Sequence, residues 1–315
     1  MRINLQALGC RLNEAELQQW AGKFRAYGHE ITARVDDADL LVVNTCAVTG
    51  EAGRKSRQLI RRAQRNNPRA KLVVSGCYAT LEQQQTAAME GVDLVIPNED
   101  KDQLVQRVHE QLDINSMPVL AQRPAEHVLF QRGRARAFIK VQDGCRWRCT
   151  YCIVTLARGA ERSTPVHEIV EQVNRQAEQG VKEVVLTGVH LGGYGSDCGS
   201  DLFALTRAVL TETDIPRIRF GSLEPWDLHE DFFHLFENSR LMPHLHLPLQ
   251  SGSDSVLKLM ARRCNTSDFA GLVQQARESI PDFNVTTDII VGFPGETEAE
   301  WKAGYDFVGS VGFGP

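Results

Sequence analysis

The chain has 315 residues, of which 42% are hydrophobic and 24% are charged. This composition is typical of a globular protein, and the length allows two domains. The formal net charge of −5 excludes a uniformly basic nucleic-acid-binding protein, so any contact with nucleic acid must come from a local patch. Because no secretion signal opens the sequence and no apolar run is long enough to cross a bilayer, we expect a cytoplasmic protein without a membrane partner.

Residues 1–115 alternate short apolar runs with amphipathic stretches, which is the pattern of a parallel sheet with helices on its faces. We therefore predict an α/β fold with a flavodoxin-like N-terminal domain and the strand order 2-1-3-4-5. The predicted strands are 3–8, 29–35, 40–44, 72–76 and 93–96, and the predicted helices are 13–27, 50–66, 80–90 and 99–112.

Residues 116–136 show no sustained periodicity and are predicted to be a linker. The alternation resumes over residues 137–315, where it predicts a partial, truncated parallel βα barrel. The predicted strands are 137–143, 183–189, 217–223, 244–249 and 284–292, and the predicted helices are 165–179, 201–212, 229–240, 253–261, 267–280 and 296–310. The chain stops where a further strand is expected.

A first set of cysteines, Cys145, Cys149 and Cys152, has the spacing CxxxCxxC and follows the first strand of the second domain. A disulfide framework does not fit a cytosolic chain, because the cytosol keeps thiols reduced. A structural zinc site would need a fourth ligand, and no Cys or His follows at finger-like spacing. Three thiolates on one loop fit a four-iron four-sulfur cluster that leaves one iron open.

A second set, Cys10, Cys46 and Cys77, is spread along the chain, but each member follows a predicted strand. In the order 2-1-3-4-5 these are three adjacent strands, and the carboxyl ends of parallel strands meet at one edge of the sheet. The sequence therefore predicts that the three thiols converge on an auxiliary iron–sulfur cluster. The alternative interpretation is three unrelated small residues at strand ends. Cys198 and Cys264 lack partners at ligand spacing.

Several segments together resemble one family: ALGCRLNEAE, NTCAVTGEAGRKSRQ, VSGCYA, KVQDGCRWRCTYCIV, RGAERS, LTGVHLGGYG, HLPLQSGSDSVLKLMARR and DIIVGFPGET. They resemble the methylthiotransferases of the radical S-adenosylmethionine (SAM) superfamily, and within these the tRNA threonylcarbamoyladenosine enzymes. The resemblance covers essentially the whole chain. The family, however, continues into a last barrel strand and a C-terminal RNA-binding domain, to which nothing here corresponds.

The resemblance implies an enzyme that transfers sulfur-containing groups. Its substrate would be N6-threonylcarbamoyladenosine at tRNA position 37, beside the anticodon, and its product the 2-methylthio derivative. Cys145, Cys149 and Cys152 would hold the radical-generating cluster, and Cys10, Cys46 and Cys77 the auxiliary cluster that carries the transferred sulfur. The cofactors would be these two four-iron clusters and S-adenosylmethionine, and the partners tRNA and a one-electron donor of the flavodoxin type. Position and resemblance together suggest S-adenosylmethionine contacts for Tyr151, Thr187, Gly188, Glu224, Gln250 and Asp288.

Arginines recur at helical spacing in the predicted helix after Cys46 and form one basic stripe, at Arg54, Arg57, Arg61 and Arg65. Such a stripe can contact RNA phosphates, although an ordinary solvated basic face is an equal alternative. Three other functions also remain open. They are methylthiolation of isopentenyladenosine in tRNA, methylthiolation of a ribosomal-protein aspartate, and a non-catalytic metal-binding RNA module.

Overall fold

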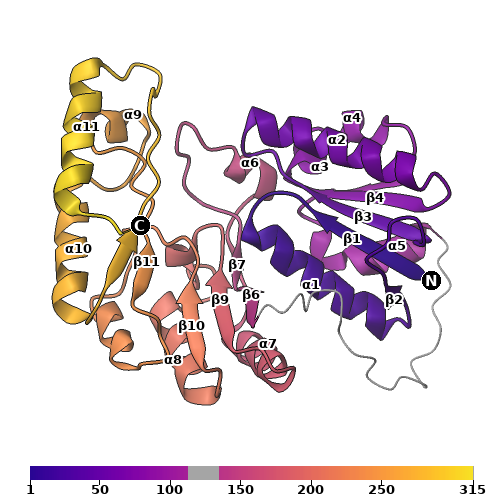
Figure 1. The fold of residues 1–315 in the computed structure, drawn as a ribbon, viewed down its shortest axis with the longest axis horizontal. Coiled ribbons are helices and arrows are strands. Elements are labelled where there is room, and N and C mark those ends of the chain that lie inside the picture. The colour runs from indigo at the N-terminus through magenta and orange to yellow at the C-terminus, as the bar shows by residue number, and fades with distance from the viewer. Residues whose placement is uncertain (113–134, 315) are drawn as a thin grey trace. The chain divides into compact units, whose positions relative to one another are not determined.

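The computed structural model describes residues 1–112 and 135–314 (Figure 1). These residues form two compact units. Unit 1 consists of the chain up to residue 134 together with residues 153–159, and unit 2 consists of residues 135–152 and 160 onward. All of the predicted linker except residues 135 and 136 lies outside the described residues.

Unit 1 is built on a five-stranded parallel sheet with the order β2-β1-β3-β4-β5, which confirms the predicted strand order. The central strands β3 and β4 carry runs of buried apolar residues because helices cover both faces of the sheet (Figure 1). The strands are β1 (Arg2–Ala7), β2 (Glu30–Ile31), β3 (Leu40–Thr45), β4 (Lys71–Gly76) and β5 (Leu94–Ile96).

Two apolar cores lie on the two faces of this sheet. Trp20 and Phe24 of α1 (Arg11–Ala26) pack with Leu104 of α5 (Leu104–Gln111) in one core. Ile60 of α2 (Gly50–Asn66) and Tyr78 of α3 (Cys77–Leu81) belong to the other. The remaining helices of the unit are α4 (Gln83–Ala87), the 3-10 helix η1 (Lys101–Gln103) and α6 (Val154–Arg158).

Two elements of unit 1 differ from the prediction. The predicted helix 80–90 is two short helices, α3 and α4, because Glu82 between them has the non-helical angles φ −119° and ψ 45°. The predicted strand 29–35 shrinks to β2, since only Glu30 and Ile31 pair with β1 at this sheet edge. Beyond Ile31 the chain leaves the sheet, and Ala33 and Arg34 are exposed.

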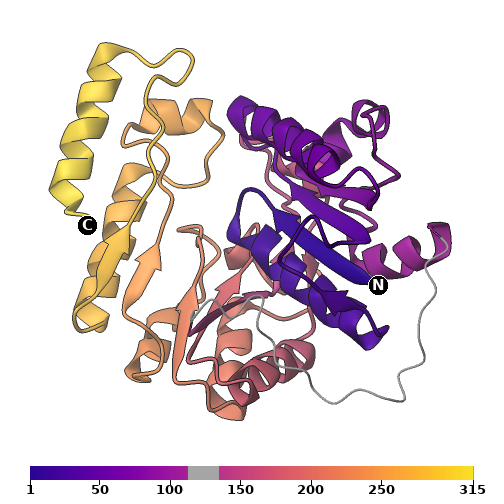
Figure 2. The ribbon, with the colours of Figure 1, turned by 45° about the vertical axis from the view of Figure 1, so that its right-hand side comes forward.

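Unit 2 contains a three-stranded parallel sheet with the order β10-β9-β6 and a parallel pair β11-β12. Isolated bridges from Ile218 to Leu241 and from Ser222 to His246 connect these strands, as expected for part of a βα barrel. Figure 2 shows the parallel strands of this unit side by side, with helices along them. The strands are β6 (Arg136–Lys140), β9 (Glu183–Thr187), β10 (Arg217–Phe220), β11 (His244–His246) and β12 (Asn284–Thr286), with a short antiparallel pair β7 (Gln142–Asp143) and β8 (Arg162–Ser163).

The helices of unit 2 pack on these strands around one large apolar core. The predicted helix 229–240 is instead the shorter 3-10 helix η3 (Phe232–Glu237). Four of its six residues are buried, and the other two, His234 and Glu237, pair on the surface at 3.2 Å. The predicted strand 284–292 ends at Thr286, after which one isolated bridge at Ile289 remains. The other helices are α7 (Val166–Glu178), η2 (Leu191–Gly193), α8 (Leu202–Glu212), α9 (Asp254–Leu259), α10 (Thr266–Ser279) and α11 (Glu298–Val311). No described helix is both long and apolar enough to span a membrane.

Candidate functional site

Three cysteines of unit 1 lie at the carboxyl edge of its parallel sheet. Cys46 directly follows β3, Cys77 directly follows β4, and Cys10 lies three residues after β1. The three strands are neighbours, with Ala7 paired to Asn44 and Asn44 to Ser75 in register. Parallel pairing therefore brings these residues, 36 and 31 positions apart in sequence, to one edge of the sheet.

The three thiols lie close enough for Cys10 and Cys77 to change the pKa of Cys46. A Cβ atom placed on Gly9 would lie 2.6 Å from Cβ and 2.8 Å from Sγ of Cys46, so the backbone before Cys10 lies directly against the Cys46 side chain. Burial raises the pKa of the Cys46 thiol, and the nearby Cys77 and Cys10 raise it further, whereas the Arg158 guanidinium lowers it. The edge thus offers three convergent sulfur ligands, and their role in holding a cluster stays a prediction.

In unit 2, Cys145, Cys149 and Cys152 share one loop after β7. Burial raises the pKa of Cys145 to about 12, and nearby Glu224, Glu161 and Cys152 act in the same direction. A cationic metal centre would favour the thiolate that this environment disfavours, because a coordinating thiol is deprotonated outright. Without such a centre the Cys145 thiol stays protonated at neutral pH.

Cys149 lies beside Tyr151 and Arg262. The Arg262 guanidinium donates a hydrogen bond to Cys149 Sγ at 4.0 Å. Burial raises the pKa of the Tyr151 phenol; nearby Arg262 lowers it, while Cys149 and Cys152 raise it. The structure therefore gathers the three loop cysteines with an aromatic ring and a guanidinium around them.

The other residues predicted to contact S-adenosylmethionine lie at the carboxyl ends of the unit 2 strands. Thr187 ends β9 and is buried. Gly188 follows it and packs closely against Gln142, because a Cβ atom placed on Gly188 would lie 3.0 Å from Gln142 Oε1. Gln250 adopts a positive φ of 79° and lies beside Asp288, whose Oδ2 is 3.2 Å from His246 Nε2. Glu224 follows β10.

Buried polar atoms around Cys149 and Cys145 fit a polar ligand. Glu224 Oε2, Trp226 Nε1 and Arg262 Nε are buried without a hydrogen-bond partner among the described residues. Burial also raises the pKa of the Glu224 carboxyl. Leaving such groups unpaired costs free energy, so a molecule with both charged and hydrogen-bonding groups, as S-adenosylmethionine has, would satisfy them.

His190 is held by hydrogen bonds on both ring nitrogens. Its Nδ1 lies 2.6 Å from Glu161 Oε1, and Trp147 Nε1 donates to its Nε2 at 3.2 Å. Asp227 Oδ2 also lies 3.5 Å from this Nε2, so three polar groups fix the orientation of the ring. Ligand atoms of Cys145, Glu161 and His190 lie within 4.8 Å of one another, so this set could also hold a single metal ion. Metal binding through a ring nitrogen of His190 would break the hydrogen bond that this nitrogen makes with Glu161 or Trp147.

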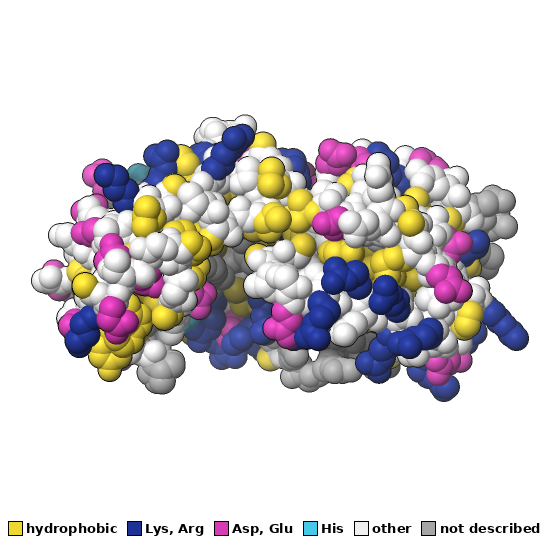
Figure 3. Space-filling view, turned by 90° about the horizontal axis from the view of Figure 1, so that it is seen from above, with side chains coloured by type: hydrophobic (Ala, Val, Ile, Leu, Met, Phe, Trp, Pro, Cys, Tyr) yellow, Lys and Arg dark blue, Asp and Glu magenta, His cyan; other side chains and the backbone are white. Residues whose placement is uncertain are grey.

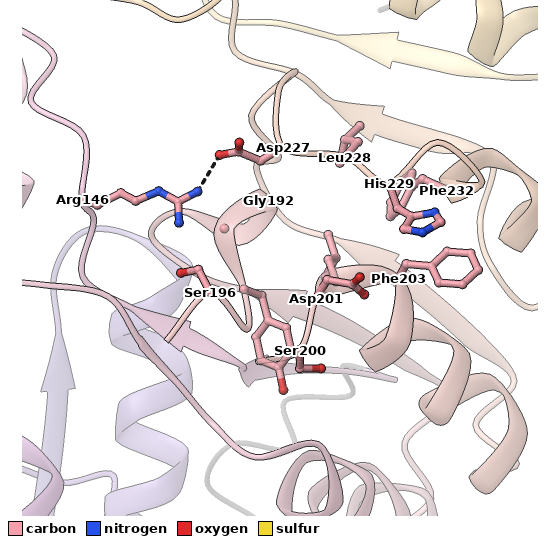
Figure 4. Close-up of a pocket in the computed structure, with 13 residues that line it drawn as sticks. Arg146, Gly192, Ser196, Ser200, Asp201, Phe203, Asp227, Leu228, His229 and Phe232 are labelled. Carbon is pink, nitrogen blue, oxygen red and sulfur yellow. Dashed lines mark hydrogen bonds and ion pairs between the residues drawn. The ribbon is translucent and has the colours of Figure 1, made fainter. Parts of the chain in front are cut away.

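A cavity of about 320 Å³ lies next to the cysteine loop and is lined by loops that follow β9 and β10 (Figure 4). Arg146, the residue after Cys145, reaches across it to Asp227 at 3.0 Å and to Glu161 at 3.3 Å. Because both carboxylates hold the guanidinium, Arg146 anchors the cysteine loop to the loop after β10.

The predicted basic stripe lies on α2. Thr49 caps this helix by accepting a hydrogen bond from the Ala52 amide. Lys and Arg side chains gather on the face of unit 1 that carries the helix (Figure 3). Arg61 and Arg65 are exposed, Arg54 pairs with Glu51 at 3.8 Å, and the Arg57 guanidinium lies 5.6 Å from the centre of the Tyr78 ring, next to Cys77.

Sequence reasoning missed the polar groups that support the cysteines of unit 1. Asn13 accepts from Cys10 Sγ at 3.8 Å, and Asn98 Nδ2 lies 3.7 Å from Cys77 Sγ. Glu16 and Asn13 are buried on the face of α1 that also carries Leu17 and Trp20. A carboxylate and an amide on an otherwise apolar helix face are the signal that could have revealed them.

Family models match both parts of the chain. A model described as the radical SAM superfamily matches residues 139–308, and one described as uncharacterized protein family UPF0004 matches residues 2–97. The solved structure of TsrM, a radical S-adenosylmethionine methyltransferase from Kitasatospora setae, shares the fold with a TM-score of 0.72 at 15% identity. That alignment covers 98% of this chain and 73% of TsrM. The protein is a member of the radical SAM superfamily, which implies one four-iron four-sulfur cluster and S-adenosylmethionine.

Relatives in sequence show which family within the radical SAM superfamily the chain belongs to. Two proteins named threonylcarbamoyladenosine tRNA methylthiotransferase MtaB, from Aquifex aeolicus and Bacillus subtilis, are each 37% identical to this chain. The alignments cover 98% and 97% of this chain and 77% and 70% of the relatives. A Bacillus subtilis tRNA-2-methylthio-N(6)-dimethylallyladenosine synthase is 33% identical over 96% of this chain and 62% of its own length. The chain belongs to the methylthiotransferase family of radical SAM enzymes.

Proposed function

We propose that this protein is a tRNA methylthiotransferase that converts N6-threonylcarbamoyladenosine at position 37 to its 2-methylthio derivative. The observation that carries the proposal is the presence of two separate cysteine trios. One lies at the carboxyl ends of three parallel strands of unit 1, and the other lies on the single loop after β7 in unit 2. One cluster is enough to cleave S-adenosylmethionine. A second cluster at Cys10, Cys46 and Cys77 would supply the sulfur that a methylthio group contains.

The chemistry of the substrate supports the use of such cofactors. The C2–H bond of adenine is neither acidic nor electrophilic enough for the general bases and nucleophiles that side chains supply. When bound, the cluster and S-adenosylmethionine supply radical chemistry that can remove this hydrogen. The protein's own task is to hold, orient and shield the reacting groups.

Residues of unit 2 would hold S-adenosylmethionine. Arg262 Nε and Glu224 Oε2, both buried and without partners among the described residues, would pair with its carboxylate and its polar groups. Arg262 also contacts Cys149, so it would connect the cofactor to the cluster loop. Tyr151 would cover the cysteines with its ring, which stands edge-on to Phe293 at a centroid distance of 6.5 Å.

The arginines of α2 would contact the tRNA backbone. In the described part of the chain, Arg61 and Arg65 are exposed and make no ion pair. Phosphate contacts from such a stripe contribute affinity independent of sequence. The names of the relatives given above describe enzymes that act on tRNA, which agrees with this assignment.

Anaerobic reconstitution tests the cluster content. The proposal expects about eight irons per chain. Cys46→Ala and Cys149→Ala should each lose about half of this iron, and Cys198→Ala, an exposed cysteine outside both trios, is the matched control. Retention of full iron in Cys46→Ala would refute the second cluster. Zinc bound through Cys145, Glu161 and His190, with no iron, would support the non-catalytic metal-binding module instead.

Nucleoside mass spectrometry tests the substrate. We expect tRNA from a deletion strain to lose the 2-methylthio derivative of threonylcarbamoyladenosine and to keep that of isopentenyladenosine. The opposite pattern would assign the isopentenyladenosine reaction, and no change in either nucleoside would point to the ribosomal-protein aspartate.

A further inference from the structure

A buried ion network lies beside the cysteine edge of unit 1. The Glu16 carboxylate of α1 accepts from Lys101 Nζ at 2.5 Å and from Arg158 Nη1 at 3.0 Å. All three side chains are at most 2% exposed. These three are the buried Asp, Glu, Lys and Arg side chains among the described residues of unit 1, and both cations contact the same carboxylate.

Asn13 connects this network to two of the cysteine-bearing loops. Arg158 Nη2 donates to Asn13 Oδ1 at 2.8 Å. The Asn13 amide in turn donates to Leu8 O at 2.6 Å and to Thr45 O at 3.3 Å. Leu8 lies two residues before Cys10 and Thr45 directly before Cys46, so Arg158 fixes both loops through one amide.

Asn98 connects the network to the third cysteine. Its Nδ2 donates to Ala157 O at 2.6 Å and lies 3.7 Å from Cys77 Sγ, while its Oδ1 accepts from Lys101 Nζ at 3.1 Å. The network therefore reaches all three cysteine loops. Ala157 and Arg158 both come from α6, so this one helical turn supplies contacts toward each cysteine.

The origin of α6 in the chain is unexpected. Its contacts assign residues 153–159 to unit 1, although the residues on both sides of this segment belong to unit 2. The segment starts directly after Cys152, the last cysteine of the CxxxCxxC loop. Arg158 lies six residues after Cys152, and its side chain contacts Asn13 and Glu16 of unit 1.

We propose that Arg158 is a positioning residue for the auxiliary cluster: it holds the loops of Cys10 and Cys46 through Asn13 and raises the cluster's reduction potential with its buried positive charge. This inference rests on the proposed second cluster. A cluster held by three thiolates becomes more negative on reduction, and a desolvated cation nearby stabilises the more negative state. Burial makes this effect larger than that of a surface arginine, whose charge water and salt screen.

The test uses the full chain with Cys145, Cys149 and Cys152 replaced by alanine, so that only the auxiliary cluster assembles. Into this parent we introduce Arg158→Met, which removes the charge and the hydrogen bonds, or Arg158→Lys, which keeps the charge but loses the planar fork to Asn13. Arg34→Met is the matched control, because Arg34 is 73% exposed and pairs with Asp37 on the surface of the same unit. Iron and sulfide are counted, and the midpoint potential is measured by titration followed by electron paramagnetic resonance.

We expect Arg158→Met to shift the potential to more negative values and to lower the iron content, and Arg158→Lys to lower iron content while keeping the potential near that of the parent. Arg34→Met should match the parent in both. Equal potentials and iron contents in parent and Arg158→Met would overturn the inference and leave the proposed function standing. Absence of any cluster from the parent would refute the auxiliary cluster itself and the inference with it.

Hydrogen exchange of the apo chain separates positioning from loss of folding. In Arg158→Met we expect faster exchange at the Cys10 and Cys46 loops and in α6, with the strands of unit 1 still protected. If Arg158→Met cannot assemble a cluster, Arg158→Lys decides the electrostatic part, and a potential well below that of the parent would overturn it. Unchanged exchange at all three segments would overturn the positioning part.

Discussion

Replacing Glu16 by glutamine removes the negative charge that two buried cations share while keeping the size of the side chain. Lys101 and Arg158 would keep their charges in a site from which water is excluded. Breaking a buried ion pair by removing one partner costs about 3–5 kcal/mol, mostly because the remaining charge is left uncompensated. No cavity forms, and the amide oxygen can still accept from Lys101 and Arg158. The amide nitrogen then faces Asn44 Nδ2, which donates to Glu16 Oε2 at 2.8 Å, so the loss contains the missing charge and this one hydrogen bond.

The assay is native-state hydrogen exchange of α1 and β1, which reports on unit 1 by itself. A cost of about 3–5 kcal/mol corresponds to faster exchange by about a hundredfold to a few thousandfold for amides that exchange through global opening. Trp20 offers a second probe in this unit, because its Nε1 donates to Lys101 O at 3.2 Å and its fluorescence should change when η1 detaches.

Glu14→Gln is the matched control on the same helix. Glu14 is 36% exposed and pairs with Arg11 at 2.8 Å on the surface, so its loss should cost at most about 1 kcal/mol. Similar small changes in Glu16→Gln and Glu14→Gln would refute the reasoning that the buried network depends on its carboxylate.

Three further predictions concern unit 1. Gly9→Ala should destabilise the unit by about 1–3 kcal/mol and lower its iron content, because Gly9 has a φ of +107° and no room for a Cβ. Gly22→Ala, in an open position of α1, should instead stabilise the unit by about 0.5–1 kcal/mol, and urea unfolding measures both changes. Burial, the charge of the amino terminus and His109 lower the pKa of His29 from 6.5 to about 4. The neutral ring therefore favours folding above pH 6.5, and this stability is lost as the pH falls toward 4. The free energies of unfolding at pH 7 and pH 5 should differ less in His29→Gln than in the wild type. Arg61→Gln with Arg65→Gln should weaken tRNA binding and make the salt dependence shallower by about one unit of slope per lost phosphate contact, as measured by filter binding across salt concentrations.

Each of these predictions has an outcome that contradicts it. Equal stability of Gly9→Ala and wild type would mean that the loop before Cys10 relaxes without cost. An unchanged pH dependence in His29→Gln would assign the acid sensitivity to other groups. A weaker affinity with an unchanged salt slope would show that the α2 arginines act on folding and not on phosphates.

The sequence alone determined the class of fold and the two cysteine sets. Apolar runs separated by amphipathic stretches indicated parallel strands, and the predicted order was confirmed, because parallel pairing with short crossovers allows few topologies. Cys145, Cys149 and Cys152 could be recognised because their spacing is local. Cys10, Cys46 and Cys77 could be grouped because each follows a strand.

Only the tertiary structure decided what surrounds these thiols. The contacts of Arg158 with Asn13 and Glu16 span 145 and 142 residues, and no local pattern encodes such a pairing. The segment after Cys152 packs in unit 1, where Arg158 and Ala157 meet the buried polar groups of Asn13, Glu16 and Asn98. Periodicity reports the face that a residue presents, whereas the partner on that face is selected by packing, burial and charge once the chain has folded.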